Sequence, residues 1–546
     1  MHPFVARFAP YWSLLLLPLV CFGPPGFQDV RGQVAKPPAG NAVEQAAAAL
    51  YEGVISETLP NGLRVFLKPV PGATVITTMV GYKVGACDED LDQTGLSHYL
   101  EHLMFKGTDK LFPGDIDRAT LRNGGANNAW TSEDLTLYHF DFAAEQWEVP
   151  LKIEADRMRN IRIDEKHEFQ QEKGAVIAEL ERNEDRPWDL EFKALLPLLF
   201  GKTGPYGHPV IGEREHVRAA TAEIIKRHYD RWYHPNNAVL VVCGGFDPVK
   251  VMAKIKELFG SIQKQDLPAR KPGQTVQRNA PVRHEFKSKF EVPRLVIGYD
   301  GVRTGDPDYY PLVVLQQVLS GGKTSRFYKK LIEGEEIATA AEAMISAGRY
   351  PGWCGVLVEL LQGKSREQAE KLVLAEVKRL QDEPVSDAEL KRVKQGIISS
   401  SIFGRENVHD LAENIAVGVS IQDLDYLKSY LPKINAVTAQ DVQRVAKKYF
   451  NPEQRVTVWS VPEERKGAAA PRRPAGGGPR GGPHPPGGRP PAAPPPAARP
   501  RRVSGPCGRG SVLAEGDAAR GAAQRPDALA LRESPAADLC RRPCHP

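Results

Sequence analysis

Apolar and polar residues follow strand-like and helix-like patterns between residues 51 and 462. Alternating residues on either side of Pro60-Asn61-Gly62, in VISETLPNGLRVFLKPV, predict a β-hairpin, and TVITTMVGYKVGA (74–86) predicts another strand. Helical periodicity follows at 94–106, 143–160, 164–184 and 221–233. Because helices and antiparallel-rich strands occur in blocks, we expect an α+β fold and not a doubly wound parallel sheet.

An internal repeat indicates that one folding unit is used twice. Residues 221–245 read TAEIIKRHYDRWYHPNNAVLVVCGG, and residues 438–460 read TAQDVQRVAKKYFNPEQRVTVWS. Each stretch has a threonine cap, an amphipathic helix, an aromatic pair, a proline and a strand, and the offset is 217 residues (438 − 221). The sequence therefore predicts two similar α/β-layered domains.

Changes in composition set the expected boundaries of these domains. The first domain is expected at 51–270 and the second at 282–462, with a linker into the fold at 36–50 and a second linker at 271–281. Residues 463–546 are rich in Pro, Gly and Arg and have no apolar period, so we expect a disordered tail. A solvated tail or an out-of-frame translation is favoured over a functional basic arm.

The first 35 residues are predicted to be a signal peptide or an N-terminal anchor. His2 and Arg7 precede the apolar run WSLLLLPLVCFG (12–23), which is too short to span a bilayer comfortably and suits the core of an export signal. We therefore expect a bacterial protein exported to the periplasm or to a membrane-associated place outside the cytoplasm. Cleavage and retention of the signal both remain open.

Bulk composition is that of a globular protein, with 41% hydrophobic and 25% charged residues in 546. The net charge of +5 is a weak signal for nucleic acid, and we expect no nucleic-acid partner. Cys87, Cys243 and Cys354 lie in the globular part, and their wide spacing matches no zinc or redox motif.

The stretch GLSHYLEHLMFKG (95–107) carries the first candidate chemistry. His98 and His102 are four residues apart, so on a helix they project from one face and could both reach one zinc ion. Glu101 stands beside His102, close enough to act on a zinc-bound water without being a ligand. The alternative is a pair of partly exposed histidines beside a surface glutamate.

A third zinc ligand is best supplied by QQEKGAVIAELERNE (170–184). Glu172 and Glu179 are seven residues apart, two helical turns, and so share a face with the apolar Val176. The alternative is an acidic, solvated helix face, which is the common use of charged helices.

Three motifs together resemble a known family. HYLEH (98–102), GGANNAWTSEDLTLYHF (124–140) and EKGAVIAEL (172–180) are similar to the pitrilysin/insulysin family of inverted-motif (HxxEH) zinc metallopeptidases, which includes the mitochondrial processing peptidases and bacterial two-domain relatives. The motifs have the family's order and spacing, and the resemblance runs from about residue 50 to 462.

The resemblance implies a role for each matching residue. His98, His102 and Glu179 would hold one Zn²⁺ per chain, Glu101 would be the general base, and Glu172 would orient a ligand histidine.

The resemblance also implies a place for the substrate. Asn128, Ala129 and Thr131 would belong to an edge strand that pairs with extended peptides or unfolded segments through backbone hydrogen bonds. The alternative for Asn128 is a turn residue after Gly124-Gly125.

The second domain is expected to be inactive and metal-free. Shifting the motif by 217 residues lands on LQQVL (315–319), and no H-x-x-E-H occurs in 280–462. Such a domain in the family often supplies an arginine and a tyrosine to the substrate, but Ile332 and Thr339 stand at those places here. We therefore expect a hetero-oligomer with a related zinc-free subunit, and a homodimer is the alternative.

Two functions of different classes follow from these patterns. The first is a zinc-dependent metalloendopeptidase that hydrolyses peptide bonds in extended peptides, with Glu101 activating zinc-bound water. The alternative is a non-catalytic structural or assembly subunit on the same fold, and a metal-binding protein without peptidase activity is a weaker rival. A scaffold has no chemical need for two histidines, a base and a distal glutamate together, which favours the peptidase.

Overall fold

The computed structural model describes residues 45, 48–165, 168–273 and 275–463. The predicted signal peptide, most of the linker at 36–50 and all but the first residue of the predicted tail lie outside the described residues. Within the described part of the chain, no helix is both long and apolar enough to cross a membrane.

The first half of the fold contains strands β1 to β6 and the helices between them. The strands are β1 Ile55–Thr58, β2 Arg64–Pro69, β3 Val75–Tyr82, β4 Ala126–Thr131, β5 Thr136–Ala143 and β6 Ala238–Gly244. The helices are α2 Leu96–Leu103, α3 Asp115–Arg122, α4 Glu148–Asn160, α5 Phe169–Glu184, α6 Asp189–Phe200, α7 Arg214–Ala219, α8 Ala222–Trp232 and α9 Pro248–Phe259. Short 3₁₀ turns are η1 Ala86–Asp88, η2 Ala144–Gln146 and η3 Pro235–Asn237.

The second half has the same kinds of element in a similar sequence. Its strands are β7 Val282–Ser288, β8 Arg294–Asp300, β9 Ala338–Ser346, β10 Trp353–Leu360 and β11 Val456–Pro462. Its helices are α10 Tyr309–Ser320, α11 Arg366–Asp382, α12 Asp387–Phe403, α13 Val408–Ile421, α14 Leu424–Ala436 and α15 Ala439–Tyr449, with the π-helical η4 Tyr328–Gly334 and the 3₁₀ turn η5 Pro452–Gln454.

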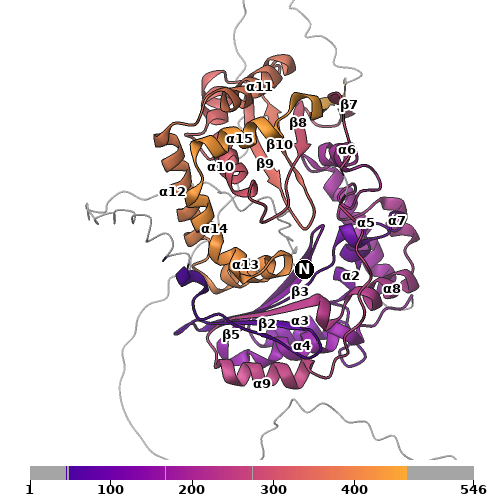
Figure 1. The fold of residues 1–546 in the computed structure, drawn as a ribbon. Helices are drawn as coiled ribbons and strands as arrows, with labels where there is room; N and C mark the ends of the chain where they lie inside the picture. Colours follow the sequence, from indigo (N-terminus) through magenta and orange to yellow (C-terminus); the bar gives the residue numbers. More distant parts are fainter. Residues whose placement is uncertain (1–44, 46–47, 166–167, 274, 464–546) are drawn as a thin grey trace, which may run out of the picture. The chain divides into compact units, whose positions relative to one another are not determined.

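Two sheets form the frame of the fold (Figure 1). Among the described residues, one sheet has six strands in the order β1-β2-β6-β3-β5-β4, and the other has five in the order β7-β11-β8-β10-β9. Without β1 the two orders correspond strand for strand, and in each sheet only the first pair of this shared order, β2 with β6 and β7 with β11, is parallel. The prediction of two similar, layered α+β domains with antiparallel-rich sheets is confirmed.

The sequence repeat marks equivalent places in the two halves. Helix α8 is capped by the Thr221 side chain, which accepts a hydrogen bond from the Ile224 N–H, and helix α15 is capped by Thr438, which accepts one from the Asp441 N–H. In each half the helix ends at an aromatic pair, and a short turn that begins with proline then leads into the sheet's parallel strand.

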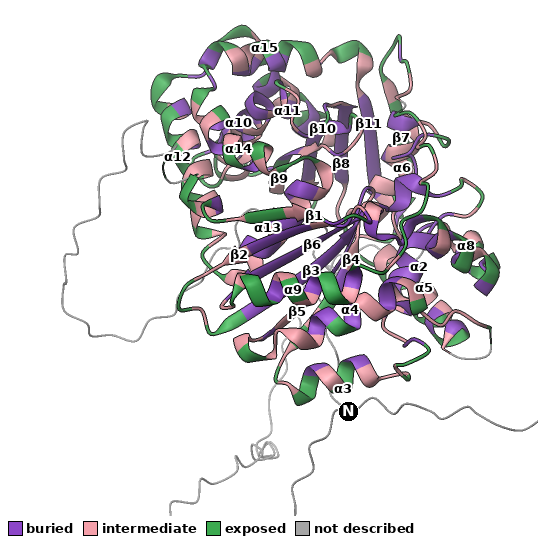
Figure 2. Cartoon of the chain, turned by 60° about the horizontal axis from the view of Figure 1, so that its bottom comes forward, coloured by how far each residue is buried: buried purple, intermediate pink, exposed green. Residues whose placement is uncertain are grey.

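Each sheet is covered on one face by a helix from the other half of the chain. Helix α13 packs on β3 and β6 of the first sheet, and helix α6 packs on β8 and β11 of the second (Figures 1 and 2). Both helices have apolar faces that are buried in these contacts. The predicted domain boundaries stay predictions, and the packing adds that the two halves exchange a helix.

Glycine lets both exchanged helices approach closely. A methyl group at Gly81 of β3 would lie 3.1 Å from Ser420 Oγ of α13, and one at Gly298 of β8 would lie 3.0 Å from Leu195 Cδ1 of α6. These glycines are 217 residues apart (298 − 81), so they occupy the same place in the repeat. The close approach is therefore built into both copies of the unit.

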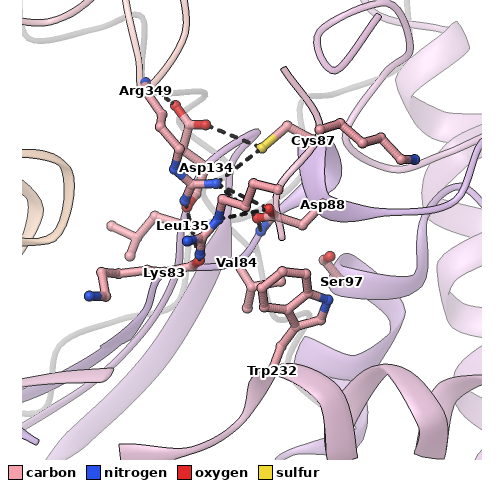
Figure 3. Close-up of polar contacts among 12 residues, drawn as sticks. Lys83, Val84, Cys87, Asp88, Ser97, Asp134, Leu135, Trp232 and Arg349 are labelled. Carbon is pink, nitrogen blue, oxygen red and sulfur yellow. Dashed lines mark hydrogen bonds and ion pairs between the residues drawn. The ribbon is translucent and has the colours of Figure 1, made fainter. Parts of the chain in front are cut away.

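A buried polar cluster joins the segment before α2 to the second half of the chain. Figure 3 shows the Arg349 guanidinium directed at Asp88, with Nη1 3.1 Å from both carboxylate oxygens. The Arg349 backbone N–H donates to Asp134 Oδ2 over 2.8 Å, and the Cys87 thiol donates to Asp134 Oδ1 over 3.3 Å. Burial beside these acids raises the pKa of Cys87 well above its usual value. The thiol is therefore structural and unreactive.

Candidate catalytic and metal site

Helix α2 carries the HxxEH motif and begins at a tightly packed turn. Its N-cap, Gly95, has a φ of 89°, and a methyl group there would lie 2.5 Å from the Ile211 carbonyl oxygen. The Glu89 carboxylate accepts hydrogen bonds from the Gly95 N–H over 2.7 Å and from the Ser97 N–H over 2.6 Å. Two of the unpaired N–H groups at the helix start are thereby satisfied, which fixes the direction of the helix.

Helix α5 lies against α2 and presents its two predicted acids to the motif. The Tyr99 hydroxyl donates a 2.6 Å hydrogen bond to the Phe169 carbonyl at the start of α5. Glu172, Val176 and Glu179 are all buried on that face of α5. The alternative of an acidic, solvated face is therefore wrong for this helix.

Three side chains converge as the ligands of one metal ion would. His98 Nε2 lies 3.7 Å from Glu179 Oε1, and His102 Nε2 lies 3.5 Å from Glu179 Oε2. The two imidazole rings have centroids 4.9 Å apart and are nearly perpendicular, at 74°. Two imidazole nitrogens and one carboxylate, brought together from two rigid helices, are a donor set that fits zinc. The alternative of surface histidines is wrong, because His98 is buried and His102 is mostly so.

Glu172 orients His102 from the side opposite Glu179. Glu172 Oε2 lies 3.2 Å from His102 Nδ1, and Lys106 Nζ lies 2.9 Å from Glu172 Oε1. Burial lowers the pKa of His102, but hydrogen bonds with Glu172 and Glu179 outweigh it and raise that pKa to about 9. His98 has no such carboxylate on its other nitrogen, and burial lowers its pKa to about 4. The carboxylate therefore leaves His102 Nε2 directed at the metal position.

Lys106 is a functional neighbour that the sequence interpretation missed. It stands four residues after His102, one helical turn on, so the i, i+4 spacing was the available signal. Its positive charge keeps Glu172 ionised, and the pKa of Glu172 lies below its usual value although burial alone would raise it.

Glu101 lies beside the ligands and is held by a residue of strand β4. Burial raises the pKa of Glu101 to about 7, against the opposing effects of His102 and of a hydrogen bond from Thr131. The Thr131 hydroxyl donates to Glu101 Oε2 over 2.6 Å. A carboxyl group with a pKa near neutrality can both accept and return a proton.

The predicted substrate strand is β4, the edge strand of the first sheet. Among the three predicted substrate residues, only Asn128 is exposed. Ala129 is packed in the core, and the Thr131 side chain contacts Glu101. Any contribution of Ala129 and Thr131 to substrate pairing would therefore come from their backbone groups. The alternative of a turn at Asn128 is wrong, because Asn128 pairs with His139 within the β4–β5 ladder.

The second half places apolar residues where the first has its ligands. Helix α10 follows β8 as α2 follows β3, and its Leu315, Val318 and Leu319 are buried. Arg326, which lies near the expected substrate arginine in sequence, forms an ion pair with Glu389 through Nη2 at 2.9 Å.

We expect Thr131→Val to lower peptidase activity about fivefold, because a net hydrogen bond is worth about 1 kcal/mol. The change removes the hydroxyl that donates to Glu101 and keeps the side-chain shape. Thr131→Ser, which retains the hydroxyl, is the control and should keep nearly full activity. Equal rates for the valine variant and the unchanged protein would contradict this role of Thr131.

We expect Glu172→Gln to weaken zinc affinity by about 10- to 100-fold, as loss of a group that orients a ligand histidine does. A competition titration against a chromophoric chelator measures this affinity directly. Glu181→Gln on the same helix removes an exposed carboxylate that pairs with Arg214, and it should leave the affinity unchanged. The role of Glu172 would be refuted if both variants bound zinc alike.

Comparisons with known proteins agree with this geometry. The sequence model described as Insulinase (Peptidase family M16) matches residues 64–212, and the one described as Peptidase M16 inactive domain matches residues 219–397. Together they match more than half of the chain, which belongs to the M16 peptidase family.

The relatives include named zinc proteases. The chain is 29% identical to the zinc protease PqqE of Helicobacter pylori over 74% of this chain and 92% of that protein. It is 25% identical to a "Probable mitochondrial-processing peptidase subunit beta" of Arabidopsis thaliana over 72% of this chain and 75% of that protein. A crystal structure of a protease from Helicobacter pylori superposes with a TM-score of 0.71 and 26% identity, covering 75% of this chain and 99% of that one.

Proposed function

We propose that the chain is a zinc-dependent metalloendopeptidase that cleaves extended peptides or unfolded segments. The convergence of His98, His102 and Glu179, with Glu101 beside them, is the observation that carries the proposal. The family and the names of its relatives support a peptidase and zinc as the metal.

The residues of the chain divide the work of hydrolysis. A zinc ion bound by His98, His102 and Glu179 would supply Lewis acidity, which acidifies water and polarises the peptide carbonyl. Glu101 takes a proton from the attacking water and returns it to the leaving amine. Thr131 holds the Glu101 carboxylate, and Glu172 holds His102 in the ligating tautomer.

We infer that the peptide binds along β4 as an added strand. β4 is an edge strand and ends at Thr131, next to the base, so a chain paired with it would pass the reacting groups. Backbone pairing does not depend strongly on side chains, so we expect selection for unfolded conformation more than for a strict sequence.

A related zinc-free subunit is the partner that we propose. The chain lacks an arginine and a tyrosine at the expected places in its second half, and one relative bears the name of a processing-peptidase subunit. A homodimer is the second candidate. Full activity of the purified chain at concentrations where it is monomeric would refute the need for either partner.

The decisive experiment is cleavage of a quenched, unstructured peptide by the full-length chain before and after chelation. We expect cleavage to stop with chelator and to return with added Zn²⁺. The structural-subunit alternative predicts no cleavage with metal bound and with an Arg/Tyr-bearing homologue present, and that result would overturn the proposal.

Export remains a proposal that rests on the apolar run at 12–23 after His2 and Arg7. Fusing residues 1–35 to a reporter that is active only outside the cytoplasm would test it. An inactive reporter in a bacterial host would refute export by this segment.

A further inference from the structure

A second set of metal-ligating side chains lies on the other face of the first sheet. His139 and Asp141 alternate along β5 with Tyr138 and Phe140, which pack in the core with α2. Neighbouring residues of a strand point to opposite faces, so His139 and Asp141 face away from the HxxEH helix. There they meet His409, near the start of helix α13.

The three groups converge on one point. His409 Nδ1 lies 3.0 Å from both Asp141 oxygens, and His139 Nδ1 lies 3.5 Å from Asp141 Oδ2. Around a tetrahedral zinc with ligands at about 2.0–2.2 Å, neighbouring ligand atoms are about 3.3–3.6 Å apart. One ligand atom from each residue lies within 4.8 Å of the other two, so small rotations would complete a site.

The arrangement closely matches that of the HxxEH site. The His139 and His409 rings have centroids 4.7 Å apart at an interplanar angle of 78°, compared with 4.9 Å and 74° for His98 and His102. Each pair of imidazoles has one carboxylate between its nitrogens, from Asp141 or from Glu179. The two clusters thus offer the same ligand types in nearly the same geometry.

The surroundings of Asp141 orient it as a ligand. The Thr77 hydroxyl of β3 donates a 2.6 Å hydrogen bond to Asp141 Oδ1, which fixes the carboxylate. His139 Nδ1 is buried and makes no hydrogen bond within the described part of the chain, while it faces the Asp141 carboxylate. A nitrogen in that position is suited to a metal ion that the carboxylate shares.

The charge of the cluster also favours a cation. Burial raises the pKa of Asp141, but hydrogen bonds from both histidines and from Thr77 outweigh it and lower that pKa below the usual range. Burial lowers the pKa of His409, and the interaction with Asp141 reverses this and raises it. Asp141 is therefore an anion that attracts positive charge, whether a proton on His409 or a metal ion.

We propose that His139, Asp141 and His409 form a second binding site for a zinc-like divalent cation, which ties helix α13 to strand β5. Its ligands come from both halves of the chain, so bound metal would fasten the exchanged helix to the first sheet. A second group, His409, Asp410 and Glu413, lies within one helix turn. We choose the set that includes His139, because Glu413 Oε1 already accepts a 3.1 Å hydrogen bond from the Trp130 indole.

The test is a count of metal ions bound to the full-length chain. The protein is stripped with chelator, loaded with Co²⁺, passed through a desalting column and analysed for cobalt per chain. We expect two ions in the unchanged protein and one in His409→Asn. His284→Asn, which removes an exposed histidine outside both clusters, is the matched control and should retain two.

A second arm measures the new site by itself. The double variant His98→Asn/His102→Asn should retain one cobalt ion with the absorption bands of low-symmetry Co²⁺, and adding His139→Asn should remove it. The proposal is overturned if the double variant binds no cobalt, or if His409→Asn still binds two ions. This arm does not use activity, so the site can fail while the peptidase holds, or the reverse.

Folding of each variant is checked by circular dichroism before loading. If His409→Asn does not fold, the count in the double variant still decides the proposal, because its substitutions lie outside the second cluster. Zinc should also raise the unfolding temperature of the double variant, and no shift would contradict a clamp between β5 and α13.

Discussion

Glu101→Gln is expected to lower kcat by about 10²–10⁴-fold, the usual cost of losing a general base. The amide keeps the shape of the side chain and can still contact the Thr131 hydroxyl, but it cannot take a proton at neutral pH. The three proposed ligands are untouched, so zinc binding should persist. Single-turnover cleavage of a quenched peptide, with metal content measured on the same sample, tests both expectations.

A result that separates the rate from the metal is essential to this prediction. Loss of zinc together with loss of activity would mean that Glu101 supports the metal site, and the role of a base would then be unproven. Retention of more than about a tenth of the rate, well above the loss expected for a base, would contradict the assignment. Glu89→Gln is a poor control, because Glu89 caps helix α2.

Arg157→Met is expected to cost about 3–5 kcal/mol of folding free energy, because it leaves a buried carboxylate without its partner. Arg157 and Glu154 are both fully buried in helix α4 and form two hydrogen bonds of 2.9 and 2.6 Å. The guanidinium also lies 4.5 Å from the Tyr138 ring centroid, directly behind the strand that carries His139. Urea unfolding followed by tryptophan fluorescence measures the loss.

The double variant Glu154→Gln/Arg157→Met tests the cause of this loss. It removes both charges, so it should recover part of the stability that Arg157→Met loses. Arg118→Met, which breaks an exposed i, i+3 pair with Asp115, should change stability by less than about 1 kcal/mol. Equal effects of Arg118→Met and Arg157→Met would contradict the importance of burial.

Local patterns were enough to predict the helix of the HxxEH motif, the acidic helix that faces it and the repeat. Each of these depends on spacing within one element, and such spacing can be seen in a single chain. Boundaries were less certain. The helix predicted from residue 143 begins at Glu148, because strand β5 continues through Ala143 and a 3₁₀ turn follows it.

Contacts between distant elements could not be predicted in this way. Nothing in the spacing of Thr131 shows that its hydroxyl reaches Glu101, 30 residues earlier, because that contact depends on how β4 packs on α2. The same holds for His139 and His409, which are separated by most of the chain. The family resemblance described the backbone role of the edge strand and was silent on these side chains.

The exchange of helices α6 and α13 has a consequence for synthesis. The ribosome releases the chain from its N-terminus, so the first sheet is finished at Gly244 well before helix α13 is complete at Ile421. During that interval the apolar face of β3, including Met79, has no cover. At about 5–20 residues per second the wait lasts many seconds, long enough for aggregation to compete. The first half should therefore need a chaperone, or the rest of its own chain, before it is soluble.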